Sequence, residues 1–365
     1  MTPADGRSRT MPIPLVSVVM SVFNGECFLR EAVESILAQS LRDFEFIIID
    51  DGSTDRSASM LDSYQNSDVR LKVYHREHGG LIESLNRGCA LAQGKYIARM
   101  DADDVAIKDR LAWQIEFMDA HPEIGVVGGA VEWIDATGKS LAVRRYPSDD
   151  PQIKATLLQQ GCAFWHPTVV LRREVFAWAG GYRRVVVDSE DYDLWLRIAD
   201  HFQLANLEKV VLKYRIHPHQ VSMRKTAQQT LGILAAQVAA SARRSGLPDP
   251  LNSVAAITSE SLAALGVTQP MLRKRFASYR RDWIRNMVTA GEYSAALEAA
   301  LEILHSDLKY VDRGVIADLH LIVAKLLWEQ KRFARSFVAI GYSVIAWPAV
   351  TVRLGEAILR RLRTA

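Results

Sequence analysis

Two aspartates separated by one residue follow an apolar segment and could bind a divalent metal ion. Asp101 and Asp103 come directly after residues 95–100, which have the pattern of a buried strand. Mg²⁺ and Mn²⁺ prefer oxygen ligands and are commonly held by one or two carboxylates together with the phosphates of a substrate. The alternative is a solvated loop in which Asp103 or Asp104 merely caps the next helix.

A second acidic segment follows an earlier apolar run. Asp50 and Asp51 end the run FEFIII at residues 44–49 and precede Gly52. The Asp51 carboxylate could accept a hydrogen bond from the N–H of a nucleotide base or from a ribose hydroxyl. The segment DGST at residues 51–54 is also typical of a turn that leads into a helix cap, and both interpretations can be true together.

A sheet is needed to bring these acidic segments together. Residues 15–22 are a nearly continuous apolar run, which is typical of a parallel strand covered on both faces. Further strands are expected at 44–49, 71–74 and 96–100, and helices at 28–37, 54–64 and 81–92. This alternation predicts an α/β fold with a doubly wound parallel sheet, in which ligands bind beyond the carboxyl ends of the strands.

The common glycine-rich phosphate motifs are absent from the sequence. No G-x-G-x-x-G follows the first strand and no G-x-x-x-x-G-K-[ST] occurs, which disfavours a dinucleotide-binding or P-loop protein. Five other motifs occur in order: SVVMSVFNGECFLREAVESILAQS at 17–40, FIIIDDGSTD at 46–55, GKYIARMDADD at 94–104, HPTVVLRREVFAWAGGY at 166–182 and SEDYDLWLRIA at 189–199. Together they resemble the inverting glycosyltransferases of family two, which have the nucleotide-diphospho-sugar-binding GT-A fold. The resemblance covers about residues 16–222.

The resemblance implies roles for residues near the first, second and fourth strands. Ser21 and Phe23 match positions that line the nucleotide base and ribose, and Asp51 matches the carboxylate that hydrogen-bonds the base. Asp103 matches the principal metal ligand, with Asp101 directed to the ribose or to the metal. Mn²⁺ or Mg²⁺ is the expected ion.

The resemblance extends to a glycine pair and to a candidate catalytic base. Gly79 and Gly80 are expected to approach the donor closely, whereas His78 stands where an asparagine is common, so no role is assigned to it. Asp191, next to Glu190, matches the base that takes the proton of the acceptor. Acidic residues are also favoured at a helix N-terminus without any catalysis.

Two histidines and two tryptophans have both a structural and a functional interpretation. His166 and His217 could contact diphosphate or metal, but a histidine beside apolar strands is more often a packed residue. Trp165 and Trp195 could stack on a sugar ring or belong to the core.

These residues predict a metal-dependent inverting glycosyltransferase. The expected donor is a nucleotide-diphospho-sugar, with UDP first and GDP or dTDP as alternatives, and the acceptor is a glycan or a lipid-linked molecule. The expected pathway is bacterial surface polysaccharide or lipopolysaccharide assembly. One rival is a nucleotidyl- or other sugar-phosphate transferase of the same fold, whose usual Gly-rich, Arg/Lys-containing loop near the N-terminus the sequence lacks. The other is a catalytically inactive sugar-nucleotide-binding or scaffold protein of the same fold.

Long Ala- and Leu-rich helical patterns replace the strands after residue 222. We expect a leader at residues 1–12, a GT-A domain at 13–222 and an all-helical domain at 223–365. Residues 336–352 carry no charge and precede a basic tail, so residues 336–365 are either a buried helix or a peripheral membrane contact. The apolar length is at the lower limit for a spanning helix.

Composition places the chain among globular proteins and divides it by charge. The 365 residues are 49% hydrophobic with a net charge of +3, which argues against a nucleic-acid binder. Residues 1–222 carry a net charge of −6 and residues 223–365 a net charge of +9. The three scattered cysteines and the lack of an apolar signal before Met11 favour a cytoplasmic protein, with the cytoplasmic face of the inner membrane as an alternative place.

Overall fold

The computed structural model describes residues 13–159, 161–217 and 225–349. The expected leader, the predicted domain boundary after residue 222 and the tail at 350–365 lie outside the described residues. The chain divides into two compact units. The first contains residues up to 133 together with 142–184 and 194–215, and the second contains 134–141, 185–193 and the chain from 216 onward.

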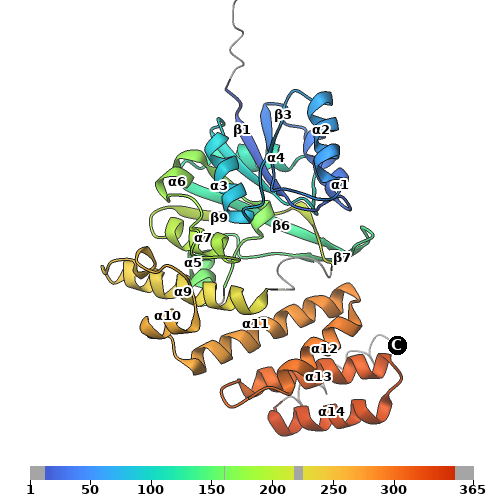
Figure 1. The fold of residues 1–365 in the computed structure, drawn as a ribbon. Coiled ribbons are helices and arrows are strands. Elements are labelled where there is room, and N and C mark those ends of the chain that lie inside the picture. The colour runs from blue at the N-terminus through green and yellow to red at the C-terminus, as the bar shows by residue number, and fades with distance from the viewer. Residues whose placement is uncertain (1–12, 160, 218–224, 350–365) are drawn as a thin grey trace, which may run out of the picture. The chain divides into compact units, whose positions relative to one another are not determined.

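The first unit is built around a mixed β-sheet (Figure 1). Its strands are ordered β3-β2-β1-β4-β8-β6-β9-β5, and β7 pairs with β6. The strands are β1 (Val16–Val22), β2 (Phe44–Asp50), β3 (Leu71–His75), β4 (Tyr96–Met100), β5 (Val105–Ala106), β6 (Ile124–Ile134), β7 (Ser140–Arg144), β8 (Val170–Arg172) and β9 (Gln203–Arg215).

The first four strands of the sheet are parallel, as the sequence predicts. Val22 at the end of β1 lies opposite Asp50 of β2, which lies opposite His75 of β3. Met20 of β1 lies opposite Met100, the last residue of β4. This register brings the acidic segments after β2 and β4 to the same edge of the sheet.

The other half of the sheet corrects the prediction of a parallel architecture. Strand β8 runs antiparallel to both β4 and β6, and β5 runs antiparallel to β9. The alternation of strands and helices that predicts a parallel sheet ends near residue 104, and the antiparallel pairs involve β5, β6, β8 and β9, which come later in the chain. The α/β class is confirmed, with a mixed sheet in place of a wholly parallel one.

Helices cover the sheet of the first unit. They are α1 (Leu29–Leu37), α2 (Ser57–Ser67), α3 (Leu81–Leu91), α4 (Arg110–Ala120), α5 (Asp150–Gln159) and α6 (Arg173–Trp178), and α7 (Glu190–Ala199) begins in the second unit and ends in the first. A short 3₁₀ turn, η1, spans His166–Thr168. Helix α3 packs closely on β1 because Gly88 has no side chain: a Cβ there would lie 2.6 Å from a methyl group of Val19.

The second unit is mainly helical, as predicted. It contains α9 (Thr226–Arg244), η2 (Pro250–Asn252), α10 (Ser259–Ala264), α11 (Gln269–Ala290), α12 (Tyr293–Leu304), α13 (Arg313–Glu329) and α14 (Phe333–Ala346). One apolar core lies between α9, η2 and α10 and includes Leu234, Leu251 and Leu262. Another joins α11 to α14. Each core buries one face of amphipathic helices, which accounts for most of their stability.

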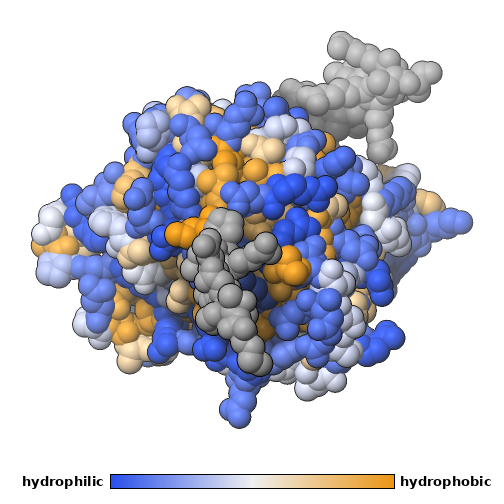
Figure 2. All heavy atoms as spheres, turned by 90° about the horizontal axis from the view of Figure 1, so that it is seen from above, coloured by the Kyte–Doolittle hydropathy of each residue, from blue (hydrophilic) through white to orange (hydrophobic). Residues whose placement is uncertain are grey.

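The surface seen from above Figure 1 is covered mostly by hydrophilic residues, with smaller hydrophobic patches between them (Figure 2). Such a mixture is usual for a globular protein, since polar groups do not cover the whole surface. Within the described ranges, every helix is too short or too polar to cross a bilayer.

Candidate active site

The loops that follow β1 and β2 are joined by hydrogen bonds between backbone and side chains. The N–H of Asn24 donates to the Ser53 hydroxyl at 3.0 Å, and the N–H of Thr54 donates to the Asn24 side chain at 2.8 Å. The N–H of Gly25 donates to the hydroxyl of Ser57 at 2.9 Å. The two loops therefore form one connected surface at the carboxyl end of the sheet.

Asp51 lies at the centre of this surface and is almost fully buried. Its carboxylate accepts the backbone N–H groups of Gly79 and Gly80, at 3.1 and 2.8 Å, and the hydroxyl of Ser84 at 2.8 Å. Nδ1 of His78 lies 2.8 Å from the same carboxylate. The structure thus brings Asp51 together with both predicted glycines, and the Asp51 carboxylate holds the N-terminus of α3 against the end of β2.

Phe23 and His78 form a ring pair beside Asp51. The ring centroids are 4.2 Å apart, with 27° between the planes, and both side chains are about half exposed. Gly52 allows the His78 backbone to pass close by: the φ of Gly52 is +78°, and a Cβ there would lie 2.8 Å from the backbone nitrogen of His78. Ser21 is the penultimate residue of β1 at the same edge. His78, to which sequence reasoning gave no role, is therefore part of the cluster.

His75 joins two carboxylates at the end of β3. Its Nδ1 lies 2.8 Å from Asp50 and its Nε2 lies 3.0 Å from Asp62. These two carboxylates, with Asp50 first, raise the pKa of His75. The folded protein therefore holds the imidazolium proton more tightly than the unfolded chain does.

We expect this histidine to make stability fall as pH rises. Its contribution is complete below about pH 6.5, the ordinary histidine pKa, and is lost as pH rises through the higher pKa of the folded state. Because His75 is 44% exposed, the loss should stay below about 1 kcal/mol. Denaturant titrations at pH 6 and pH 8.5 should show a smaller difference for His75→Gln than for the wild type. Equal differences would contradict this expectation.

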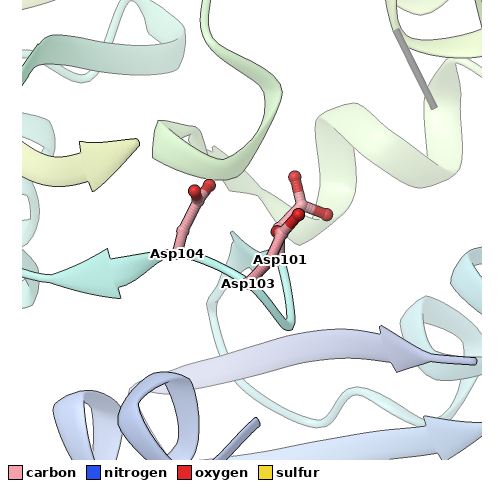
Figure 3. A group of neighbouring side chains, drawn as sticks. All are labelled: Asp101, Asp103 and Asp104. Carbon is pink, nitrogen blue, oxygen red and sulfur yellow. The ribbon is translucent and has the colours of Figure 1, made fainter. Parts of the chain in front are cut away.

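Three aspartates form the metal-ligand candidate of the first unit. One carboxylate oxygen from each of Asp101, Asp103 and Asp104 lies within 4.8 Å of the others. Figure 3 shows the three carboxylates turned to the same side of the loop between β4 and β5. The sequence predicts the first two of these residues and treats Asp104 only as a helix cap.

Burial and the neighbouring negative charges both raise the pKa of carboxyl groups in this cluster. Burial, followed by the charges of Asp103 and Asp101, raises the pKa of Asp104 well above its ordinary value. Burial also raises the pKa of Asp101, since the nearby Arg99 charge only partly opposes it. In the described part of the chain, Oδ2 of Asp104 is buried and accepts no hydrogen bond. Three converging carboxylates with an unsatisfied buried oxygen fit a hard divalent cation.

Three buried arginines surround the aspartates. Arg99 donates to the Asp101 carboxylate, and Arg110 donates to the backbone oxygen of Arg99 at 2.8 Å. Arg215, at the end of β9, donates its Nε–H to the backbone oxygen of Asp103 and its backbone N–H to the Asp104 carboxylate, both at 2.8 Å. Its guanidinium also reaches Glu31 of α1, at 2.9 Å. Arg215 therefore ties the aspartate loop to β9 and α1.

Replacing Arg215 with methionine is expected to destabilise the protein. Only 1% of the Arg215 side chain is exposed, and its replacement removes the hydrogen bond to the Asp103 backbone oxygen and the ion pair with Glu31, a loss of about 1–3 kcal/mol. The measurement is the free energy of unfolding in urea. Arg30→Met is a suitable control because Arg30, on the same helix as Glu31, is 69% exposed. Equal stability of the two variants would disprove the role given to Arg215.

Glu190 and Asp191 belong to the second unit and begin α7. Glu190 is buried and Asp191 is partly exposed, with the N–H of Tyr192 donating to the Asp191 carboxylate at 2.7 Å. The segment is held by α9: the Ser189 hydroxyl donates to the Gln229 oxygen at 3.0 Å. Gln237 also donates to the Tyr192 hydroxyl, at 3.0 Å. The helical unit therefore positions the candidate base, a function that sequence reasoning did not assign to it.

His166 and Trp195, two of the remaining sequence candidates, are packed in the first unit, whereas His217 belongs to the second. His166 lies 2.8 Å from the Tyr182 hydroxyl and contacts the Trp195 ring, and burial lowers its pKa well below the ordinary value, so it is neutral at pH 7. Trp195 is fully buried against Phe164. These contacts agree with the structural interpretation of His166 and Trp195.

Comparisons with known proteins agree with the motifs. The family model described as glycosyl transferase family 2 matches residues 17–178. The chain is 34% identical over 213 residues to the O-antigen biosynthesis glycosyltransferase WbnJ of Escherichia coli, covering 56% of this chain and 81% of that protein. It is also 34% identical to the uncharacterized glycosyltransferase MJ1057 of Methanocaldococcus jannaschii, over 56% and 72% of the two chains.

Solved structures extend the similarity in fold to most of the chain. Residues 1–349 of S. aureus TarS, in complex with UDP, match with a TM-score of 0.50 at 17% identity over 93% of this chain and 91% of that one. The mannosyltransferase PcManGT of Pyrobaculum calidifontis, in complex with GDP-Man and Mn²⁺, matches with a TM-score of 0.50 at 18% identity over 91% and 86%. The expected GT-A fold is confirmed. The chain is a glycosyltransferase and belongs to glycosyltransferase family 2.

Proposed function

We propose that this enzyme is a metal-dependent inverting glycosyltransferase that moves a sugar from a nucleotide-diphospho-sugar to an acceptor hydroxyl. The observation that carries the proposal is the cluster of Asp101, Asp103 and Asp104 at the end of β4, beside the surface that holds Asp51. Mn²⁺ or Mg²⁺ would be held by Asp103, with Asp101 and the unsatisfied oxygen of Asp104 as further ligands. A bound divalent ion supplies positive charge that stabilises the departing diphosphate.

The chain's own residues bind the donor and remove the acceptor's proton. Phe23 offers a half-exposed ring for the nucleotide base, backed by His78, and Ser21 lies beside the ribose position. Asp51 accepts from the base while it orders Gly79 and Gly80 near the diphosphate. Asp191, with Glu190 beside it, takes the proton of the acceptor hydroxyl as the oxygen attacks the anomeric carbon in line with the leaving group. One displacement of this kind inverts the anomeric centre.

The donor nucleotide and the acceptor are proposed from chemistry and from relatives. UDP is the first choice, with GDP and dTDP as alternatives, because TarS was solved with UDP and PcManGT with GDP-Man and Mn²⁺. The acceptor is a glycan or a lipid-linked molecule in surface polysaccharide assembly, in keeping with the O-antigen role named for WbnJ. We place the reaction at the cytoplasmic face of the inner membrane, where the basic second part of the chain would face anionic lipid.

The test is donor turnover across UDP-, GDP- and dTDP-sugars with Mn²⁺, with Mg²⁺ and with EDTA, followed by NMR of the product anomer. We expect one nucleotide to support turnover, EDTA to abolish it and the anomeric configuration to invert. Undiminished turnover in EDTA would refute the metal dependence, and retention would refute the single displacement. Nucleotide-sugar binding without any turnover would favour the inactive binding protein, the second candidate.

A further inference from the structure

Helix α14 has small residues on its buried face and large apolar residues on its exposed face. Ser336, Ala339 and Ser343 are buried, with exposed fractions of 1%, 5% and 0%. The Ser336 hydroxyl donates to the Ala324 oxygen at 2.7 Å and the Ser343 hydroxyl to the Ala317 oxygen at 2.9 Å, both on α13. Helices α13 and α14 lie side by side (Figure 1). An ordinary surface helix buries its large apolar residues, so the distribution of side chains on α14 is the reverse of the usual one.

The exposed side of α14 and the end of α13 form a continuous apolar face. It consists of Trp328, Phe333, Phe337, Val338, Tyr342 and Ile345, which are 49%, 45%, 61%, 58%, 54% and 77% exposed. The Trp328 ring lies 4.7 Å from the Phe333 ring and 5.9 Å from the Phe337 ring, so these three aromatic residues are contiguous. Exposed apolar surfaces of this kind mark sites of interaction with a protein or a membrane.

Two features of the apolar face favour lipid over protein. Small residues and serine hydroxyls between helices, with large apolar side chains outside, are the arrangement of helices that pack in lipid. Three of the four charged residues from 329 to 335 are basic: Lys331, Arg332 and Arg335 are exposed, as is Glu329, and the sequence has no acidic residue between Glu329 and Glu356. Basic residues beside Trp and Tyr suit the headgroup region of an anionic bilayer.

We propose that the apolar face of α13 and α14 docks on an anionic lipid bilayer. Helix α14 has 14 residues and so a length of about 21 Å, shorter than the hydrocarbon core, and it therefore lies in the plane of the interface. Docking would bring the enzyme to a lipid-linked acceptor, and this role rests on the proposed function. Vesicle binding can be measured without sugar transfer, so the two proposals can fail separately.

The experiment is flotation of the full chain with vesicles of phosphatidylcholine alone or mixed with phosphatidylglycerol. We expect binding to the mixed vesicles, weakened at least about tenfold by Phe337→Ser with Ile345→Ser, because two apolar side chains no longer leave water. The matched control is Met271→Ser with Tyr293→Ser, which changes two apolar residues of the same unit with exposed fractions of 47% and 43%. Wild-type binding by the Phe337 and Ile345 variant would overturn the proposal.

Two further variants separate lipid from other occupants of the apolar face. Arg332→Glu with Arg335→Glu should remove the preference for anionic vesicles, and unchanged preference would count against the proposal. Removal of residues 350–365, whose sequence includes Arg360 and Arg361, should weaken binding without abolishing it. Complete loss on this removal would assign binding to those residues instead. Gel filtration that shows the Phe337 and Ile345 variant losing a dimer, with vesicle binding unchanged, would assign the face to a second copy of the chain.

Discussion

Asp103→Asn is expected to remove sugar transfer while leaving the fold at least as stable as that of the wild type. Loss of the charge should lower turnover by at least about 10²-fold, because the proposed cation would lose its main ligand and no longer stabilise the leaving diphosphate. The same change removes a negative charge beside Asp104, whose pKa is raised first by burial and then by Asp103. The folded protein should therefore gain stability in metal-free buffer.

A fall in turnover together with a rise in stability distinguishes a metal-ligand role of Asp103 from a structural role. Turnover with Mn²⁺, Mn²⁺ binding and the free energy of unfolding in EDTA should be measured on the same preparation. Asp43→Asn is the matched control, since Asp43 is exposed at the other end of β2 from Asp50. A variant that keeps wild-type turnover, or that loses activity only because it unfolds, would refute the role of Asp103.

The parallel half of the sheet and its acidic ends could be predicted from the sequence because their signals are local. Strands β1, β2 and β4 are buried on both faces, so each appears as a short apolar run. Asp101 and Asp103 are two residues apart at the end of one such run, and their proximity follows from the covalent chain. The sequence therefore predicts where the aspartate cluster lies, although it does not predict that Asp104 belongs to it.

The contacts that fix the aspartate loop could not be predicted, because they join distant segments. Arg215 bonds to Asp104 across 111 residues of sequence and to Glu31 across 184. Asp104 carries no sequence signal that separates a buried candidate ligand from a helix cap; in the structure it precedes β5, and Asp109 is the residue before α4. An arginine near the end of a largely apolar strand pattern, as Arg215 is in VVLKYRI at 210–216, is the sign that could have directed attention to this residue.

The unit to which residues 185–193 belong could not be predicted from the sequence either. Residues 185–193 come from the part of the chain assigned by motif to the catalytic domain, yet they pack with the helical unit, where Val186 joins the core of Leu234 and Leu251. Gly232 leaves room for this segment, since a Cβ there would lie 2.9 Å from the side chain of Ser189. Position in the sequence therefore did not indicate which unit holds the candidate base.

Asp191→Asn is expected to lower kcat by about 10²–10⁴-fold with little change in donor affinity, because general-base catalysis contributes an effect of this size. The amide keeps the shape of the side chain and can still accept the N–H of Tyr192, so α7 should begin at the same place. Steady-state kinetics and calorimetric titration with the donor nucleotide measure kcat and donor affinity.

Asp200→Asn provides the control, since Asp200 follows the other end of α7 and the substitution is chemically the same. It should keep kcat within about twofold of the wild type, as expected for a change remote from the reacting atoms. The Asp191 variant should also bind the donor nucleotide like the wild type, because the proposed nucleotide contacts belong to Phe23 and Asp51. If kcat and donor affinity fell together in Asp191→Asn, Asp191 would have a binding or structural role, and the base would have to be sought elsewhere.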